Sequence, residues 1–164
     1  MDIIKRKFNQ ACTDYHLLSD GDKILVAISG GKDSMLLARL MAERARIFKP
    51  QIQVEAIVMD NLPNGPDIDW IKQFCDQLGL PLHILHTSFS VTPDNPKTPC
   101  FLCSWHRRKV LFTFATEHGF NKIALGHHQD DIIVTWLMNI TFEGNASPAM
   151  RPIVAMQHYP ISII

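Results

Sequence analysis

The sequence has no apolar run long enough to cross a bilayer and no excess of charge of either sign. Sixteen Lys and Arg balance 16 Asp and Glu among its 164 residues, so no overall field draws the chain toward nucleic acid or an anionic membrane. A membrane-spanning helix needs roughly 20 consecutive apolar residues, and no stretch approaches that length. The chain suits one soluble domain, and any RNA contact has to come from a local basic patch.

Cysteine is scarce as well. Cys12, Cys75, Cys100 and Cys103 are too few and too unevenly spaced for the disulfide framework of a small secreted protein. Residues 1–10 are polar and charged, without the apolar core of a signal peptide. We therefore expect a cytoplasmic protein with no membrane partner.

Two common nucleotide-binding motifs are absent. A Walker A loop would need glycine in place of Val26 and Ser or Thr in place of Asp33. The dinucleotide fingerprint Gly-x-Gly-x-x-Gly does not occur. If the chain binds a nucleotide, it does so with a different loop.

Such a loop is present at Ser29–Ser34, with the sequence Ser-Gly-Gly-Lys-Asp-Ser. It follows the apolar run 23–28 and precedes a helical pattern that starts at Ser34. The first amides of a helix lack partners within the helix and carry the positive end of its dipole, so they bind anions. Adjacent glycines let the backbone approach a phosphate closely, and Lys32 adds positive charge. Asp33 is unexpected in an anion site unless a divalent cation or a reacting group needs it.

Hydrophobic periodicity and turn residues predict alternating helices and strands. The helices are predicted at about 2–18, 34–48, 67–78, 104–118 and 131–142. The strands are predicted at about 23–28, 54–59, 82–85 and 122–125, with a further strand pattern entering at 159–164. This alternation predicts an α/β fold, a doubly wound and mostly parallel sheet with helices on both faces. The loops after three strands, at Ser29, Asp60 and Gly126, should then meet at one edge of the sheet.

The third of these loops, Gly126–Asp131, contains two imidazoles and two carboxylates. Asp130 and Asp131 stand where a helix begins, and we expect one of them to cap that helix. The other is a candidate to hold Mg²⁺ or to accept a proton. For His127 and His128, packing and hydrogen bonding are better supported than metal ligation.

Cys100 and Cys103 form a Cys-x-x-Cys pair, which we expect in a long loop before a helix. Such a pair serves as a zinc half-site, a redox dithiol or part of an iron–sulfur site. Arg107, Arg108 and Lys109 follow it and form a basic patch large enough to suggest contact with a phosphate backbone. A solvated helix face explains the same three residues almost as well.

Ser29–Ser34 matches, at every fixed position, the Ser-Gly-Gly-x-Asp-Ser motif of the PP-loop of the adenine-nucleotide alpha hydrolases. That superfamily cleaves ATP between the α and β phosphates. Two further motifs follow in order, Pro99-Cys100-x-x-Cys103 with Arg107-Arg108, and Gly126-His127-His128-x-Asp130-Asp131. Together, from about Asp20 to Pro152, the chain resembles the tRNA 2-thiocytidine biosynthesis family.

This resemblance implies that ATP and Mg²⁺ are used to adenylate O2 of a cytidine in the tRNA anticodon loop. Sulfur then displaces AMP, with a 4Fe-4S cluster held by three cysteines. The implied partners are tRNA, a sulfur donor such as a cysteine desulfurase, and a second copy in a homodimer. The resemblance divides the chain into a helical segment, 1–19, and a PP-loop ATP-binding domain, 20–164, which we expect to be incomplete at its C-terminus.

Carried over by position, the resemblance also assigns site residues. The implied ATP-binding residues are Ser29, Gly30, Gly31, Lys32, Asp33, Ser34, Val58, Asp60 and Gly126. The implied catalytic residues are Lys32, Asp33, Asp130 and Asp131, with Asp131 also a magnesium ligand. Cys100 and Cys103 would be the first two cluster ligands, the third being absent from this chain, and Arg107, Arg108 and Lys109 would contact tRNA.

Two alternatives remain open. One is another PP-loop enzyme that modifies tRNA, a thiouridine synthase or a lysidine synthetase, although the lysidine enzyme does not need the cysteine pair. The other is a non-catalytic remnant that binds ATP, against which the intact Asp130-Asp131 pair argues.

Overall fold

The computed structural model describes residues 2–60, 65–86, 99–144, 151–156 and 158–164. The helices in these ranges are α1 (Asp2–Asp14), α2 (Lys32–Ala45), α3 (Ile68–Leu78), α4 (Pro99–Glu117) and α5 (Gln129–Met138), which the π-helical turn η1 (Asn139–Glu143) continues. The strands are β1 (Lys23–Ile28), β2 (Gln53–Asp60), β3 (Leu82–His86), β4 (Lys122–Ala124), β5 (Val154–Ala155) and β6 (Ser162–Ile163). None of the helices described is both long and apolar enough to cross a membrane.

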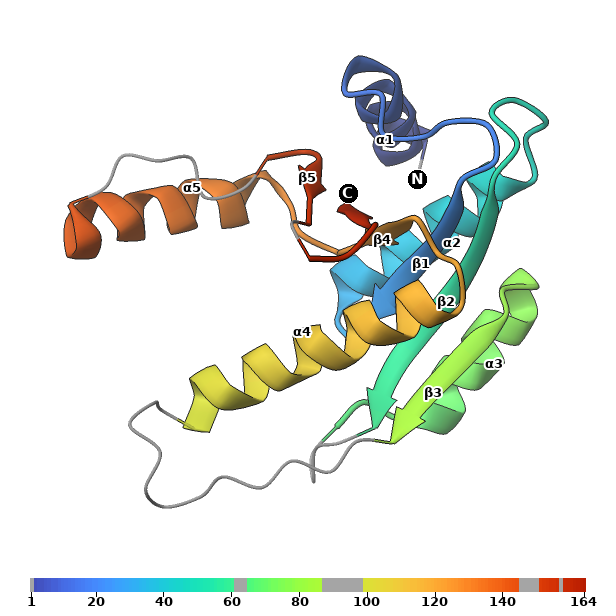
Figure 1. Ribbon diagram of the computed structural model, residues 1–164. Coiled ribbons are helices and arrows are strands. Elements are labelled where there is room, and N and C mark those ends of the chain that lie inside the picture. The colour runs from blue at the N-terminus through green and yellow to red at the C-terminus, as the bar shows by residue number, and fades with distance from the viewer. Residues whose placement is uncertain (1, 61–64, 87–98, 145–150, 157) are drawn as a thin grey trace.

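The six strands form one sheet in the order β3-β2-β1-β4-β6-β5 (Figure 1). β1 pairs in parallel with β2 on one side and with β4 on the other. β3 and β6 extend the parallel sheet, and β5 joins β6 antiparallel. The predicted doubly wound, mostly parallel sheet is confirmed. Its strand order changes direction between β1 and β4, the position at which open α/β sheets bind ligands.

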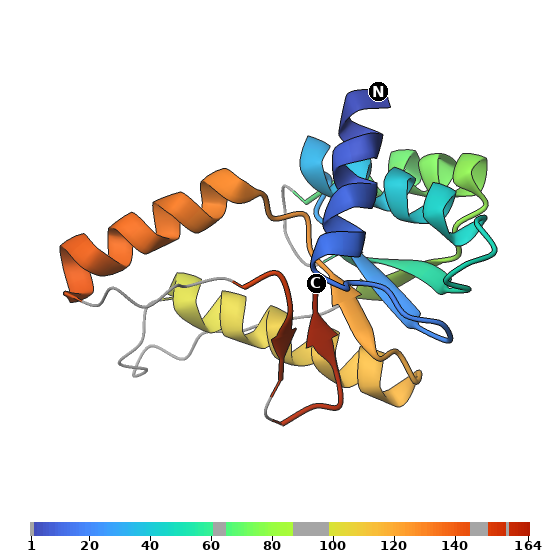
Figure 2. The ribbon, with the colours of Figure 1, turned by 90° about the horizontal axis from the view of Figure 1, so that it is seen from above.

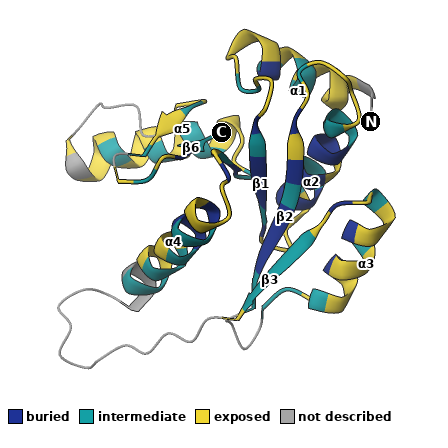
Figure 3. Cartoon of the chain, turned by 45° about the vertical axis from the view of Figure 1, so that its right-hand side comes forward, coloured by how far each residue is buried: buried dark blue, intermediate teal, exposed yellow. Residues whose placement is uncertain are grey.

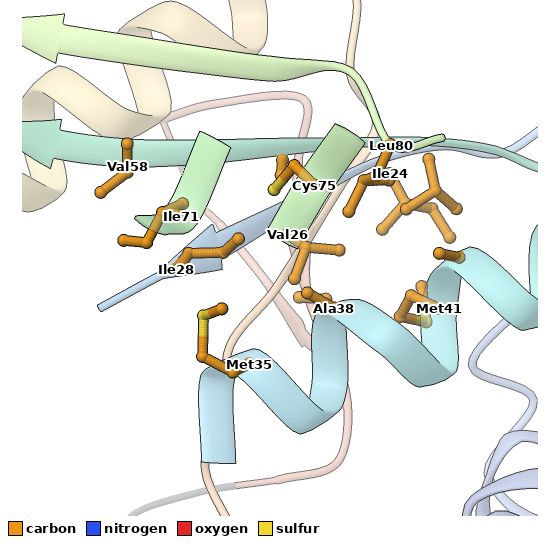
Figure 4. Close-up of a cluster of buried hydrophobic side chains, with 14 of the residues drawn as sticks. Ile24, Val26, Ile28, Met35, Ala38, Met41, Val58, Ile71, Cys75 and Leu80 are labelled. Atoms are coloured by element: carbon orange, nitrogen blue, oxygen red, sulfur yellow. The ribbon is translucent and has the colours of Figure 1, made fainter. Parts of the chain in front are cut away.

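β1 is the centre of the hydrophobic core. Ile24, Val26 and Ile28 face α2 and α3, and the side chains that surround them come from both helices (Figure 4). Leu25, between them in sequence, faces the other side of the sheet and packs in a second cluster with Phe112 of α4. An uninterrupted apolar run is what a parallel strand buried on both faces requires.

The helices divide between the two faces. α2 and α3 cover one face, where α1 also contributes Phe8 to the first cluster. α4 covers the opposite face through Leu111, Phe112 and Ala115. Figure 3 shows the resulting buried strands between partly exposed helices.

α5 differs from the other helices because it extends away from the sheet (Figures 1 and 2). None of its residues is buried, and its exposed side chains include large apolar ones. These are Ile133, Val134, Trp136, Leu137 and Met138. The position of α5 is therefore set at its first turn, where it leaves the edge of the sheet.

Several predicted boundaries hold. Asp67 caps α3 by accepting a hydrogen bond from the amide of Trp70 at 3.0 Å, and Gly79 ends that helix in a left-handed conformation.

α1 is shorter than predicted, since it ends at Asp14, before His16 takes a positive φ. α2 is also shifted: it begins at Lys32, inside the glycine motif, and ends at Ala45.

The predicted loop around the cysteine pair is wrong. α4 begins at Pro99, so the backbone of Cys100–Cys103 forms its first turn. Proline suits the first position of a helix because an amide there has no partner within the helix. The rest of the predicted loop, 88–98, lies outside the described residues. The two-residue strand β5 was not predicted, and α5 begins at Gln129, two residues earlier than expected.

A buried polar network joins the beginnings of β1 and β4. The carboxylate of Asp22 accepts hydrogen bonds from the amide of Ser19 (2.6 Å), the side-chain amide of Asn121 (2.8 Å) and the ammonium of Lys122 (2.6 Å). The Lys122 ammonium also donates to the carbonyl of Leu17 at 2.8 Å. The side chains of Asp22 and Lys122 are only 5% and 12% exposed, so each charge depends on the other.

Replacing Lys122 by Ala should therefore lower the free energy of unfolding by about 3–5 kcal/mol, because it leaves the Asp22 carboxylate buried without its cation. Urea unfolding of the variant and the parent chain measures the difference. Lys5→Ala, which breaks the exposed Lys5–Glu43 pair (2.8 Å), is the matched control and should have a small effect. Equal losses in the two variants would contradict this account of the network.

Candidate functional site: the glycine loop and the turn after β4

The glycine loop is closed by its two serines. The Ser34 hydroxyl donates to the carbonyl of Gly31 (2.9 Å) and accepts from the amide of Ser29 (3.1 Å). The hydroxyls of Ser29 and Ser34 lie 3.1 Å apart. Ser34 is buried, so these contacts hold the end of β1 and the first turn of α2 as one unit.

The first turn of α2 carries the charged residues of the loop. α2 begins directly after Gly31, so its first amides point out of the helix at the end of β1. The ammonium of Lys32 contacts both carboxylate oxygens of Asp33, at 2.9 and 3.0 Å. The Lys32 side chain is 85% exposed, so it can turn toward an anion held by the amides.

Three loops meet at this point. A Cβ on Gly126 would lie 2.9 Å from both the Cα and the nitrogen of Ser34, which shows how closely the turn after β4 approaches α2. On the other side, a Cβ on Gly30 would lie 2.7 Å from the Cβ of Pro66, in the loop after β2. Gly30 also has a φ of +84°, which favours glycine. The predicted meeting of the loops after β1, β2 and β4 is confirmed.

The N-cap residue of α5 is His128, not one of the two adjacent aspartates, and Asp131 completes a capping box from the third position of the helix. The Asp131 carboxylate accepts a hydrogen bond from the backbone amide of His128 at 2.9 Å. This bond lowers the pKa of Asp131 against a smaller opposing effect of burial, and the nearby His128, His127 and Lys32 lower it further. Asp130 lies beside it with its side chain exposed to solvent.

His128 stands between the two helix beginnings. Its Nδ1 lies 3.4 Å from a carboxylate oxygen of Asp131, and its Nε2 lies 4.0 Å from one of Asp33. Sequence reasoning assigned this side chain to packing and hydrogen bonding and gave it no place in the site. The spacing Gly-His-His-x-Asp-Asp was the available signal, since residues three apart at a helix start lie on the same side.

The end of β2 has two different surfaces. Val58 is 1% exposed and its side chain belongs to the core (Figure 4), so only its backbone is available to a ligand. Asp60 is partly exposed and contacts Nδ1 of His86, at the end of β3, at 3.0 Å. Sequence reasoning did not find His86, because β3 carries no motif.

The cysteines fall into two groups. Cys12 and Cys75 are buried, and burial raises the pKa of both thiols, that of Cys75 to about 11. Such thiols are core residues rather than metal ligands. Cys103 is partly exposed on α4, and the side chain of Cys100 lies outside what the structure describes. Among the described side chains, no three His, Cys, Asp or Glu are grouped to hold a metal ion.

The three residues of the predicted basic patch lie in the middle of α4. Arg107, Arg108 and Lys109 are consecutive in α4, and consecutive helix residues point about 100° apart. Arg108 and Lys109 are exposed, and the Lys109 ammonium lies 5.3 Å from the centre of the Trp105 ring. The basic side chains therefore spread around the helix.

A glycine turn that leads from a central parallel strand into a helix N-terminus, where the strand order changes direction, defines the class of nucleotide-binding α/β proteins. Comparison with known families narrows this class. Residues 1–161 match the family model of the PP-loop domain, and the chain belongs to this family.

Its relatives include tRNA-cytidine(32) 2-sulfurtransferases. The chain is 39% identical over 152 residues to the enzyme of Bdellovibrio bacteriovorus, covering 91% of this chain and 58% of the relative. It is 36% identical over 146 residues to that of Pseudomonas putida, covering 87% and 53%. The chain thus spans about half the length of the curated relatives it matches.

A solved structure with the same fold is the U34-tRNA thiolase NcsA from Methanococcus maripaludis, determined with its 4Fe-4S cluster. It superposes with a TM-score of 0.72 at 28% sequence identity, over 87% of this chain and 50% of that chain. The likeness confirms the PP-loop fold.

The pKa of Asp131 gives a test of the cap. Because folding depresses this pKa, the stabilisation is complete above the ordinary aspartate pKa and is lost as the pH falls through the depressed one. Asp131→Asn should therefore be less stable than the parent chain at neutral pH, and the difference should shrink on acidification. Thermal unfolding between pH 7 and about pH 3 measures it. Asp130→Asn is the control, and a difference for Asp131→Asn that stays constant with pH would contradict the cap.

Proposed function

We propose that the chain is the ATP-binding part of an enzyme that thiolates cytidine 32 of tRNA. The observation that carries the proposal is the close approach of Gly126 to Ser34, which joins the glycine loop to the turn of Asp130 and Asp131. The names of the relatives support the choice of tRNA and of cytidine. The cytoplasm as location, a cysteine desulfurase as sulfur donor and a homodimer are further parts of the proposal.

The glycine loop is the proposed site for the phosphates of ATP. The amides of Gly30, Gly31 and Ser34 would bind the pyrophosphate, and the mobile Lys32 would offset its charge. The adenosine would lie near Asp60 and the backbone of Val58, at the end of β2. The glycine loop already contacts the loop after β2, where Gly30 meets Pro66, and the turn after β4, where Gly126 meets Ser34. The proposed site therefore needs little rearrangement to bind ATP.

The proposed reaction has two steps. O2 of the cytidine attacks the α-phosphate, AMP is transferred to that oxygen, and pyrophosphate leaves toward the helix amides. Sulfur delivered at the oxidation level of sulfide then attacks C2, the bond from C2 to the adenylated oxygen breaks, and AMP leaves to give 2-thiocytidine. Lys32, Asp33, Asp130 and Asp131 are the proposed catalytic residues, and Arg107, Arg108 and Lys109 are proposed to contact tRNA.

Magnesium fits the residues at the site. It is usually held by one or two carboxylates together with the phosphates of the substrate, and Asp131 offers such oxygens. Magnesium would neutralise phosphate charge during the transfer. The Asp33 carboxylate keeps Lys32 close to the loop, through contacts of 2.9 and 3.0 Å to its two oxygens.

An iron–sulfur cluster is only partly provided for. Cys100 and Cys103 are proposed to supply two ligands from the first turn of α4. Cys12 and Cys75 do not fit as the third, because both are buried and Cys75 belongs to the core on the opposite face of the sheet from α4. The described residues do not complete a ligand set, so we derive no step through the cluster.

A second candidate is a thiouridine synthase. The solved neighbour NcsA, a U34-tRNA thiolase, favours it. The two candidates differ in the base that is thiolated, so an assay has to identify the nucleoside.

ATP affinity tests the phosphate site. Lys32→Ala should weaken ATP binding by about tenfold, the effect of one charge-assisted contact, and Gly126→Ala should weaken it at least as much because a Cβ collides with the Ser34 backbone. Calorimetric titration of the chain with ATP and Mg²⁺ measures both. Gly119→Ala is the control: it strains a glycine with a φ of +72° far from the loop, and should cost stability without changing affinity. Unchanged affinity in Lys32→Ala would mean that ATP binds elsewhere.

The modified nucleoside tests the overall reaction. In cells that depend on the complete gene product, Cys100→Ala and Cys103→Ala should each abolish 2-thiocytidine at position 32, as measured by mass spectrometry of tRNA digests. Cys12→Ala, which alters a buried thiol outside α4, should leave the modification in place. Loss of 2-thiouridine at position 34 instead would establish the second candidate.

A further inference from the structure

The turn after β4 contains an imidazole that the proposed reaction does not yet use. We propose that His128 is a positioning residue of the phosphate site, whose Nε2 holds the Asp33 carboxylate when the Lys32 ammonium leaves it for a phosphate. This inference rests on the proposed function, because it assumes that a phosphate binds at the glycine loop.

The contacts of Asp33 show why a second partner is needed. Both of its oxygens contact the ammonium of Lys32. If Lys32 turns to an incoming phosphate, the Asp33 carboxylate is left unpaired at the first turn of α2, beside the negatively charged phosphate. Repulsion between the carboxylate and the phosphate would then oppose binding.

His128 is close enough to replace Lys32 as the partner of the Asp33 carboxylate. Its Nε2 lies 4.0 Å from Oδ2 of Asp33, about one ångström beyond a hydrogen bond, so a small rotation of either side chain closes the gap. Both side chains are about half exposed, which leaves them room to move. The close approach of Gly126 to Ser34 fixes the backbones that carry them, so the separation is set by the fold.

The second ring nitrogen of His128, Nδ1, gives a weaker reason for an imidazole at this position than Nε2 does. Nδ1 lies 3.4 Å from the Asp131 carboxylate, but the same oxygen already accepts the backbone amide of His128 at 2.9 Å. That amide remains whatever side chain stands at position 128. The imidazole also faces the backbone amide of Asp131 as the N-cap side of a capping box, a place that a short Asn side chain can fill. The contact that needs the reach of Nε2 is the one toward Asp33.

Two amide side chains separate the roles of the two nitrogens. The amide of Gln reaches about as far as Nε2, and the amide of Asn about as far as Nδ1. We expect His128→Ala and His128→Asn to weaken ATP binding by about tenfold, and His128→Gln to stay within about threefold of the parent. Calorimetric titration of the full chain with ATP and Mg²⁺ measures the affinities, and thermal unfolding shows that each variant is folded.

A double-mutant cycle distinguishes positioning from a structural role. In an Asp33→Asn background the carboxylate charge is gone, so His128→Ala should change ATP affinity by less than about twofold. A general disturbance of α5 would persist in that background. His127→Gln, which alters the neighbouring imidazole, is the matched control and should stay within about twofold of the parent.

The outcomes are distinct. Rescue by Asn but not by Gln, an equal loss for His128→Ala in both backgrounds, an equal loss for His127→Gln, or no loss for His128→Ala would each overturn this inference while leaving ATP binding intact. Absence of ATP binding by the parent chain would instead overturn the proposed function and this inference together.

Discussion

The hydrogen bonds and ion pair of the buried Asp22 carboxylate are the interactions on which the placing of β1 beside β4 depends. They draw the start of β1 and the start of β4 together through Asn121 and Lys122, at the edge of the sheet opposite the glycine loop. With the two strands held in parallel, their other ends must also lie side by side. That constraint brings Gly126 against Ser34 and makes one site from two distant parts of the chain.

The site is built chiefly from backbone. Two helices, α2 and α5, begin at the same edge of the sheet, so unpaired amides and positive helix ends face the same region. Acidic and basic side chains of the first turns compensate one another there, as the contacts among Lys32, Asp33, His128 and Asp131 show. The contacts among these groups can therefore be exchanged without a change in fold.

Short sequence patterns predicted the parts of the fold that depend on interactions between residues close in sequence. The apolar run of β1 and the paired glycines each have a short-range cause, and each is found as predicted. Pro99 was misread because proline both ends loops and begins helices, and nothing nearby distinguishes the two. The contact of His128 with Asp33 and the two-residue strand β5 depend on which strands become neighbours, which a pattern of a few residues does not specify.

The order of strands also bears on how the protein is made. β1 finds β2 soon after it is synthesised, but its other neighbour arrives much later: Lys23 and its hydrogen-bond partner Asn121 are 98 residues apart. At about 5–20 residues per second, a ribosome needs several seconds to cover that distance. During that interval one flank of the central strand is open, and the nascent glycine loop has only half of its surroundings. The proposed nucleotide site is thus complete, and a bound ligand can help to hold the fold, only once the chain has passed the beginning of α5.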